Sequence, residues 1–362
     1  MRQGLEEVLL EALRRPPVVI AFSGGRDSSG LLALAVDLAR RHGLELPVPA
    51  THVFPGDLAS DERSWQEEVV RSLGLADWQR CSWADELDLV GPFAQQVLRQ
   101  HGPVYPMNAH FLLPLFELAG GGTLVTGTGG DELFGLWSKW SLARHAIWCQ
   151  RSELARLAAV AAPARLRRGV LRATAPSVPW LDRSGRQEAR RRLAEAQVEV
   201  PWRWSDLVMD RWWRSRRRLA TEQTLTALAS SYDVALSAPF MSASVLRAAA
   251  AAHPWAGFAS RAQGMQEVFA GLLAPQVLNR STKARFNSCF FAAYSRDFVR
   301  RWDGRGVGDL PVDLGALRST WQAEVVDARS FSLLQGVWYR AQEPGGARVA
   351  GATEAARQGR EP

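Results

Sequence analysis

The stretch "VVIAFSGGRDSSGLLALAV", residues 18–36, constrains the fold more than any other part of the sequence. Its first residues are apolar and β-branched, which is typical of a buried strand, and the residues after the turn have the pattern of a helix closed by Gly43. Glycines let backbone N–H groups approach an anion, and the helix N-terminus adds its positive dipole end. The turn therefore predicts a phosphate site. The lysine of kinase-type loops is absent, so γ-phosphate transfer is not favoured.

The first part of the chain alternates strand and helix patterns. Apolar strand patterns at residues 48–54 and 123–127 alternate with helical patterns at 61–75 and 110–122. Such alternation indicates a parallel sheet with helices on both faces, whose ligands bind at the carboxyl ends of the strands. We therefore predict an α/β domain over residues 1–145, with a doubly wound, mostly parallel sheet.

The composition changes after this part, where Ala, Leu, Arg and Trp become frequent. The segments "RLRRGVLRA" (165–173), "RQEARRRLAEA" (186–196) and "DRWWRSRRRLA" (210–220) predict helices with strongly basic faces. We predict a mostly helical, substrate-binding part over residues 146–342 and a disordered tail over residues 343–362.

Composition bounds the class of protein. The chain has 362 residues, of which 47% are apolar and 22% charged, with three widely spaced cysteines and no apolar run that could span a bilayer. We expect a cytoplasmic protein without disulfides, structural zinc or membrane contact. Of the 44 basic residues, only Lys139 and Lys283 are lysines. Because lysine can give up its proton and arginine cannot, a retained lysine marks a position that needs an ammonium group. Lys139 has no evident role and is expected to be structural or on the surface.

A second glycine turn, "LVTGTGGDELFGLW" (124–137), also follows a strand and carries Asp131 and Glu132. An acid beside a phosphate is unfavourable unless a cation lies between them, so Asp27 and Asp131 together predict a bound Mg²⁺. Taken singly, each turn could also be an ordinary solvated turn.

Together the two turns, S-G-G-x-D-S-S and G-x-G-G-D-E-L-F-G, resemble those of the PP-loop ATP pyrophosphatases. More closely, they resemble the synthetase domain of asparagine synthetases and of the related β-lactam synthetases and lasso-peptide cyclases. The likeness continues in "DERSWQEEVVRSLGL", "VALSAPFMSASVLRAAA" and "QEVFAGLLAPQVLNRSTKARF", and covers about residues 16–325. It implies the adenine nucleotide alpha hydrolase-like fold and cleavage of ATP to AMP and pyrophosphate, with the substrate becoming an adenylate.

The resemblance also assigns residues. Residues of the first turn would hold pyrophosphate: Ser23, Gly24, Gly25, Asp27 and Ser28. Gly127 and Gly129 of the second turn would also contribute to binding ATP. Asp27 and Asp131 would bind Mg²⁺, and Lys283 would stabilise charge at the α-phosphate and the tetrahedral intermediate. Asparagine synthetases have a glutamate, and β-lactam synthetases a tyrosine, where this chain has Thr128. A threonine hydroxyl is not a base near neutral pH. Another group then accepts the proton, the amine binds already neutral, or Thr128 only positions the nucleophile.

We therefore expect an ATP-dependent ligase that adenylates a carboxylate and transfers it to an amine, in specialised metabolite or modified-peptide biosynthesis. The sequence leaves no room for a glutaminase domain before residue 18, so the amine would be free ammonia, the product of a separate glutaminase, or part of a substrate. A carrier protein or a precursor peptide is a further candidate partner. Specificity is expected around Tyr105, Asn108 and Thr128.

Two other readings stay open. One is an RNA-modifying PP-loop enzyme that adenylates a tRNA base, which basic helices would suit. The cysteines show no paired thiolation pattern and both turns fit the ligase better, so we do not expect a nucleic-acid partner. The other is a non-catalytic scaffold that binds a peptide.

Overall fold

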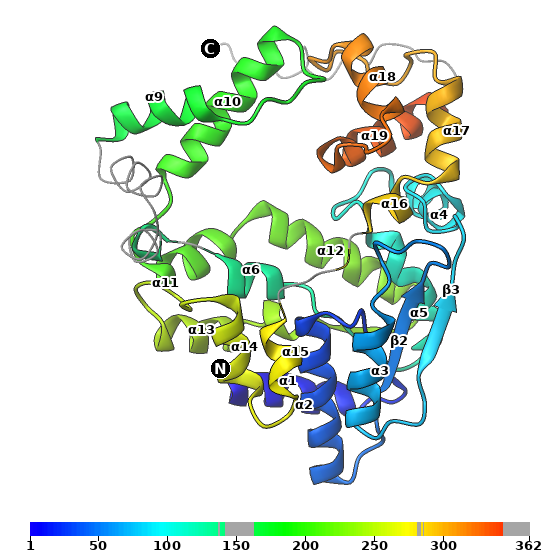
Figure 1. Ribbon diagram of the computed structural model, residues 1–362, viewed down its shortest axis with the longest axis vertical. Coiled ribbons are helices and arrows are strands. Elements are labelled where there is room, and N and C mark those ends of the chain that lie inside the picture. The colour runs from blue at the N-terminus through cyan, green and yellow to red at the C-terminus, as the bar shows by residue number, and fades with distance from the viewer. Residues whose placement is uncertain (137, 142–162, 281–283, 285, 343–362) are drawn as a thin grey trace, which may run out of the picture.

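The computed structural model describes residues 1–136, 138–141, 163–280, 284 and 286–342. Within them, five parallel strands form one sheet in the order β3-β2-β1-β4-β5. Figure 1 shows β2 and β3 side by side at one edge. The strands are β1 (Val18–Ala21), β2 (Val48–Val53), β3 (Gln79–Ser82), β4 (Thr123–Val125) and β5 (Ala235–Ser237). From β1 the chain adds strands first on one side and then on the other, which confirms the doubly wound α/β fold. The switch point, where ligands of such sheets bind, lies between the carboxyl ends of β1 and β4.

Helices make up most of the remaining ordered chain. Those before residue 141 are α1 (Arg2–Leu13), α2 (Arg26–His42), α3 (Arg63–Ser72), α4 (Pro92–His101), η1 (Ala109–Leu112), α5 (Leu113–Leu118) and α6 (Gly130–Gly135). Those from residue 163 to 241 are α9 (Ala164–Thr174), α10 (Arg183–Val198), α11 (Trp204–Asp206), the π-helical turn η2 (Leu207–Trp212), α12 (Arg216–Ser230) and η3 (Pro239–Met241). The last are α13 (Ala243–Ala252), α14 (Arg261–Phe269), α15 (Pro275–Asn279), α16 (Asn287–Phe290), α17 (Ala293–Arg301), α18 (Leu314–Gln322), η4 (Ala328–Ser330) and α19 (Phe331–Gln342).

The mostly helical character of the second part is thus confirmed. The domain boundary at residue 145 stays a prediction, and the sheet takes its fifth strand, β5, from beyond it. The tail over residues 343–362 lies outside the described residues. The prediction of one helix over residues 210–220 is wrong. Ser215 interrupts it, because its hydroxyl accepts a hydrogen bond from the Arg218 backbone N–H at 3.2 Å and so caps a new helix, α12.

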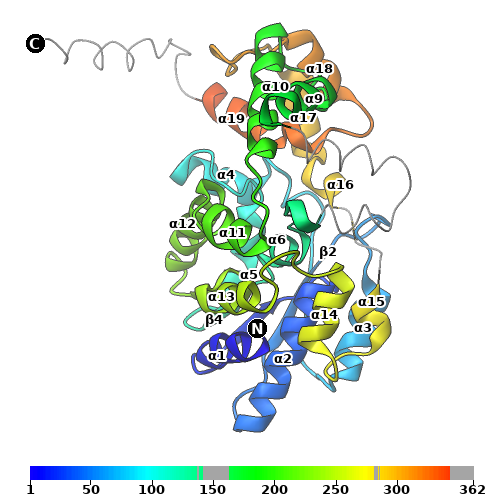
Figure 2. The same cartoon turned by 90° about the vertical axis from the view of Figure 1, so that its left-hand side faces the viewer.

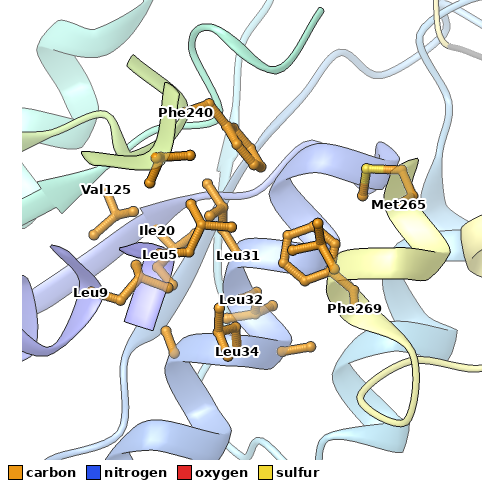
Figure 3. Close-up of a cluster of buried hydrophobic side chains, with 14 of the residues drawn as sticks. Leu5, Leu9, Ile20, Leu31, Leu32, Leu34, Val125, Phe240, Met265 and Phe269 are labelled. Atoms are coloured by element: carbon orange, nitrogen blue, oxygen red, sulfur yellow. The ribbon is translucent and has the colours of Figure 1, made fainter. Parts of the chain in front are cut away.

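Side chains alternate between the two faces of β1, as the pleat of a strand requires. Val18 and Ile20 belong to a core built with α1, α2, α13 and α14, whereas Val19 belongs to a second core built with α5 and α12. Figure 3 shows Ile20 of the first core among side chains from these helices, including Leu31 of α2 and Phe269 of α14. The sheet is therefore covered on both faces, which explains why its central strand reads as a continuous apolar run.

A third core holds the C-terminal helices together and lies at the opposite end of the molecule from α1 and α2 (Figure 2). It is joined to the rest of the chain by Asp88, a fully buried carboxylate. Asp88 accepts hydrogen bonds from the backbone N–H groups of Val90, Ala292 and Ser295, and from the Ser295 hydroxyl at 2.5 Å. This set of bonds fixes the start of α17 against the loop before α4. None of the described helices is long and apolar enough to cross a membrane.

Two histidines, His52 in β2 and His110 in η1, are neutral because they are buried. His52, in β2, accepts a hydrogen bond from the Trp83 indole N–H and donates one to the Phe111 carbonyl, each at 2.8 Å. Burial lowers the pKa of His52 to about 4, and it does the same for His110. Both side chains take up protons far more readily in the unfolded chain, so the folded state should lose stability as the pH falls from about 6.5 toward 4.

We predict that His52→Gln removes part of this acid sensitivity. Glutamine offers one donor and one acceptor but does not titrate in this range. Between pH 7 and pH 5 the variant should lose about 2 kcal/mol less free energy of unfolding than the parent, measured by urea denaturation at each pH. The exposed His101→Gln is the matched control and should keep the parent's pH dependence. Equal acid sensitivity of the parent and the His52 variant would contradict the prediction.

Candidate functional site

The first glycine turn is closed by its own serines. Ser28 accepts a hydrogen bond from the Ser23 backbone N–H at 3.2 Å and donates one to the Gly25 carbonyl at 3.1 Å. Gly24 has a φ of +80°, and a Cβ there would lie 2.7 Å from Cγ of Gln66 on α3. Gln66 also donates to the Ser23 carbonyl at 3.1 Å. Glycine is therefore required at this position both by backbone conformation and by the close approach of α3.

The turn leads into a helix whose N-terminus no described side chain caps. Gly25 is the N-cap of α2 and has no side chain with which to accept hydrogen bonds from the N–H groups of the first turn. These groups and the helix dipole favour an anion at this end of α2. The geometry thus agrees with the predicted phosphate site.

The second glycine turn packs directly on the first. It follows β4, and a Cβ on Gly130 would lie 2.6 Å from a carboxylate oxygen of Asp27. Gly129 adopts a φ of +95°, and a Cβ there would lie 2.6 Å from Cγ of Met241. Only glycines allow the backbone to come so close. The two turns that the sequence places about 100 residues apart therefore meet at the switch point of the sheet.

Asp27 and Asp131 meet on one guanidinium group. Arg261, the first residue of α14, pairs with an Asp27 oxygen and, through Nη1, with Oδ1 of Asp131 at 2.7 Å. Two carboxylates brought together repel each other unless a cation lies between them. In this structure the cation between the two acids is the Arg261 guanidinium, and the Mg²⁺ site at Asp27 and Asp131 stays a prediction. Among the described residues no group of three or more His, Cys, Asp or Glu side chains is arranged to hold a metal ion.

Further positive charge gathers around the first turn. Burial and the neighbouring charge of Arg261 lower the pKa of Arg26, with a smaller contribution from Arg280. Asp27 and Asp131 act in the opposite direction, so the arginines and acids around the turn partly offset one another. The arginines would also attract a bound polyanion.

Arg280 attaches the C-terminal half of the chain to the first turn. Its side chain is buried, and Nη1 donates to the Gly24 carbonyl at 2.8 Å. It also forms an ion pair with Glu62, the residue before α3, and its guanidinium lies 4.8 Å from the ring centroid of Trp65. A buried arginine with a carboxylate, a carbonyl and an indole as partners has little freedom to move.

Lys283 itself lies outside the described residues. The segment after it is held in place, because Phe286 packs edge-on against Phe54 at 6.2 Å and the Ser288 hydroxyl and Cys289 thiol each donate to Asp57 at 3.1 Å. Burial and the adjacent Asp57 raise the pKa of Cys289 to about 12. Cys289 is thus a protonated structural thiol and not a nucleophile.

Two cavities flank the switch point. One, of about 210 Å³, lies beside Ser23 and has mainly aromatic walls: Phe22, Phe54, Phe111, Phe286 and Phe290. The other, of about 370 Å³, lies beside the second turn and includes Thr128, Asp131 and Glu132. Tyr105 and Asn108, which the sequence analysis associated with specificity, line this second cavity. Asn108 lines both, so the cavities are neighbours.

Thr128 faces the second cavity as a hydrogen-bonding group. The Thr126 hydroxyl donates to the Thr128 hydroxyl at 3.0 Å, which leaves the Thr128 proton available as a donor. This arrangement suits positioning of a ligand rather than removal of its proton.

The structure brings together Ser23, Gly24, Gly25, Asp27 and Ser28 with Gly127, Thr128, Gly129 and Asp131. Sequence reasoning missed Arg261 and the partners of Arg280. Arg261 carries no motif in a chain where nearly every basic residue is arginine. Arg280 stands in the quoted "RSTKARF" segment, where only the lysine was considered.

Comparison with known proteins identifies the family of the chain. Residues 4–334 match the family model described as asparagine synthase. No curated protein sequence matches the chain significantly.

The buried pair of Arg280 and Glu62 yields a stability prediction. Arg280→Met should lower the free energy of unfolding by about 3–5 kcal/mol, because it leaves the Glu62 carboxylate buried without this partner. The double variant Arg280→Met/Glu62→Leu should be more stable than the single variant, since it removes the uncompensated charge. Urea denaturation measures both. The exposed Arg300→Met is the control and should change stability by less than about 0.5 kcal/mol. An Arg280→Met protein as stable as this control would show that the pair is unimportant.

Proposed function

The chain belongs to the asparagine synthase family and is therefore an ATP-dependent ligase that forms amide bonds. From this premise we propose that it adenylates the carboxylate of its substrate and joins it to an amine other than ammonia. The observation that carries the proposal is the meeting of both glycine turns at the switch point, with Asp27 and Asp131 on one positive charge. This arrangement supports the proposal, because cleavage of ATP to AMP and pyrophosphate requires a phosphate-binding turn and a cation in one place.

The chain's own residues divide the work of binding ATP. The closed turn from Ser23 to Ser28, at the N-terminus of α2, would hold pyrophosphate with backbone N–H groups. The cavity with aromatic walls beside Ser23 would take the adenine, because aromatic side chains provide stacking surfaces for a base. Arg26 and Arg261 add positive charge around the phosphates.

The donor set fits Mg²⁺. Magnesium is usually held by one or two carboxylates together with substrate phosphates, and Asp27 and Asp131 are two carboxylates already directed at one cation. When bound, the ion would neutralise charge on the phosphates. Arg261 would then leave its position between the carboxylates and pair with phosphate oxygens instead.

Lys283 is proposed to stabilise the negative charge that develops at the α-phosphate when the substrate carboxylate attacks it. Support comes from the family match and from the anchoring of both flanks beside the phosphate turn, by Arg280 on one side and Phe286 on the other. An ammonium group can stabilise such charge and also give up a proton, which an arginine cannot do.

The amine then has to lose a proton as it attacks the acyl-adenylate. Thr128 cannot accept it, but Glu132 lines the same cavity one residue after Asp131. We assign Glu132 as the proton acceptor and Thr128 as the group that positions the amine. A carboxylate also attracts the protonated amine into the cavity before the reaction.

The size of this cavity favours an amine larger than ammonia. Its volume of about 370 Å³ far exceeds the roughly 30 Å³ occupied by a molecule of the size of water. With Tyr105 and Leu225 among its walls it offers apolar as well as polar contacts. An amine on a metabolite or a peptide therefore suits it, which supports a role in specialised amide or lactam formation.

We predict AMP and pyrophosphate, not ADP and phosphate, as the products of ATP when the protein is incubated with Mg²⁺ and a mixture of candidate carboxylates. Asp27→Asn and Lys283→Ala should each reduce this release by about 100-fold or more, because each removes charge that stabilises the phosphates in the transition state. Chromatography of the nucleotides measures the products. The exposed Arg71→Ala on α3 serves as control and should retain the parent rate. Formation of ADP would refute the proposed reaction.

The substitution Glu132→Gln should affect the two half-reactions, adenylation and amide formation, to different extents. Exchange of labelled pyrophosphate into ATP, which reports adenylation, should stay within about threefold of the parent, whereas amide formation at pH 7 should fall by about 100-fold. The exposed Glu117→Gln is the control and should leave both rates unchanged. If Glu132→Gln slowed both half-reactions equally, Glu132 would not be the proton acceptor.

A further inference from the structure

Three tryptophans form an exposed patch next to the helix that follows the second glycine turn. Trp140, Trp202 and Trp255 are 45, 47 and 51% exposed, whereas Trp204 and Trp321 are fully buried. The ring of Trp140 lies 5.9 Å from that of Trp202 and 6.5 Å from that of Trp255. Single exposed apolar residues are ordinary, but adjacent half-exposed indoles are a marker of binding surfaces. We call these three residues the tryptophan patch.

Hydrogen bonds hold the tryptophan patch in one shape. The backbone N–H groups of Lys139 and Trp140 donate to the carbonyls of Pro201 and Trp202, at 3.1 and 3.3 Å, and the Trp204 N–H donates to the Trp255 carbonyl at 2.9 Å. A preformed patch loses little conformational entropy when a partner binds, which favours affinity.

The positive charge of the chain is concentrated beside this patch. Residues 164–198, which contain α9 and α10, carry nine arginines and three acidic residues, a net charge of +6 out of +7 for the whole chain. We call this segment the basic hairpin. Most of its arginines are exposed, and Arg165, Arg168 and Arg172 of α9 have no acidic partner among the described residues. Leu166, at 64% exposure, lies between them.

The two helices of the basic hairpin, α9 and α10, lie side by side, and the hairpin is attached to the rest of the chain at both ends (Figure 1). At its turn, Trp180 is buried in the C-terminal core, and the Asp182 N–H donates to the Pro311 carbonyl at 2.9 Å. At its other end, Arg167 of α9 donates a hydrogen bond to the Val198 carbonyl at 3.2 Å, and Val198 is four residues before Trp202. This end of the basic hairpin therefore adjoins the tryptophan patch.

We propose that the basic hairpin and the tryptophan patch together bind an acidic polypeptide segment that also carries apolar side chains. Exposed arginines pair with carboxylates, and clustered tryptophans provide sites where apolar anchors can bury. The surface lies apart from the two cavities at the switch point. On the proposed function, such a partner would be the protein or peptide that presents the carboxylate or the amine.

A nucleic acid would need aromatic ring faces on which bases can stack. Here cations already cover ring faces: the Arg203 guanidinium lies 4.2 Å from the ring centroid of Trp255, and Lys139 Nζ lies 5.5 Å from that of Trp202. Trp140 meets Trp255 at 89°, so these two rings offer no common stacking plane. The patch is thus better suited to aliphatic and aromatic side chains of a polypeptide.

The test is binding of a fluorescein-labelled synthetic peptide composed of glutamate and leucine in equal numbers, followed by fluorescence anisotropy without ATP. The full-length protein should bind it, and more weakly in about 200 mM than in about 50 mM NaCl, because charge pairs contribute. Arg165→Gln/Arg168→Gln/Arg172→Gln should weaken binding by at least about tenfold, and so should Trp140→Ala.

Matched controls remove the same charge and a similar ring elsewhere. One control replaces three exposed arginines in and just after α17, as Arg300→Gln/Arg301→Gln/Arg305→Gln. The other, Tyr294→Ala, removes a ring that is 43% exposed. Both should bind the peptide as the parent does. Circular dichroism melting checks that every variant is folded.

The proposal fails if the peptide does not bind, or if the control variants weaken binding as much as the hairpin variant does. It also fails if an RNA oligonucleotide or phosphatidylserine vesicles bind to this surface in preference to the peptide. Pyrophosphate exchange with a small carboxylate, measured in the same variants, tests the ligase activity separately. Normal exchange with lost peptide binding supports the docking surface, and lost exchange in the parent would instead contradict the proposed function.

Discussion

The meeting of two carboxylates at the switch point is the constraint on which the rest of the site depends. Strand order places the ends of β1 and β4 side by side, and glycines at the second turn let it approach Asp27. Asp27 and Asp131 then require a cation, and Arg261 provides one from α14. The protein thus keeps a charge-balanced site, and under the proposed function Arg261 would exchange these carboxylates for phosphates. Such an exchange preserves the number of charge pairs, so binding ATP need not leave any buried charge uncompensated.

This arrangement explains why the helical part of the chain cannot be separated from the sheet. Arg261 and Arg280 lie more than 230 residues after the turn they contact. Their ion pairs with Asp27 and Glu62 attach α14 and the segment before Lys283 to the first glycine turn and to α3. The strand β5 also comes from this half of the chain. Without these distant contributions the first turn would lack both the cation beside Asp27 and part of its support.

Local pattern was enough to predict the elements around the turns, because strand β1 and helix α2 are apolar where they are buried and glycines mark the turns. The sheet class followed from strand and helix alternation. The edge strand β3, with the sequence QRCS, could not be found in this way, because it is mostly exposed and has no apolar run. Arg261 and the partners of Arg280 could not be found either, since their contacts are set by tertiary packing and arginine is abundant everywhere. The role of Lys283 stays a prediction.

The distribution of charge separates two tasks within one chain. Around the phosphate turn, acids and arginines balance each other closely, as a site that must bind and release a polyanion requires. The basic hairpin instead carries almost all of the net charge of the chain, and its two helices, α9 and α10, have few buried residues. A polar helix pair of this kind gains little from burial, so stability alone does not account for nine arginines there. Under the proposed docking role, long-range attraction would favour them, because a concentrated positive field accelerates encounter with an acidic partner.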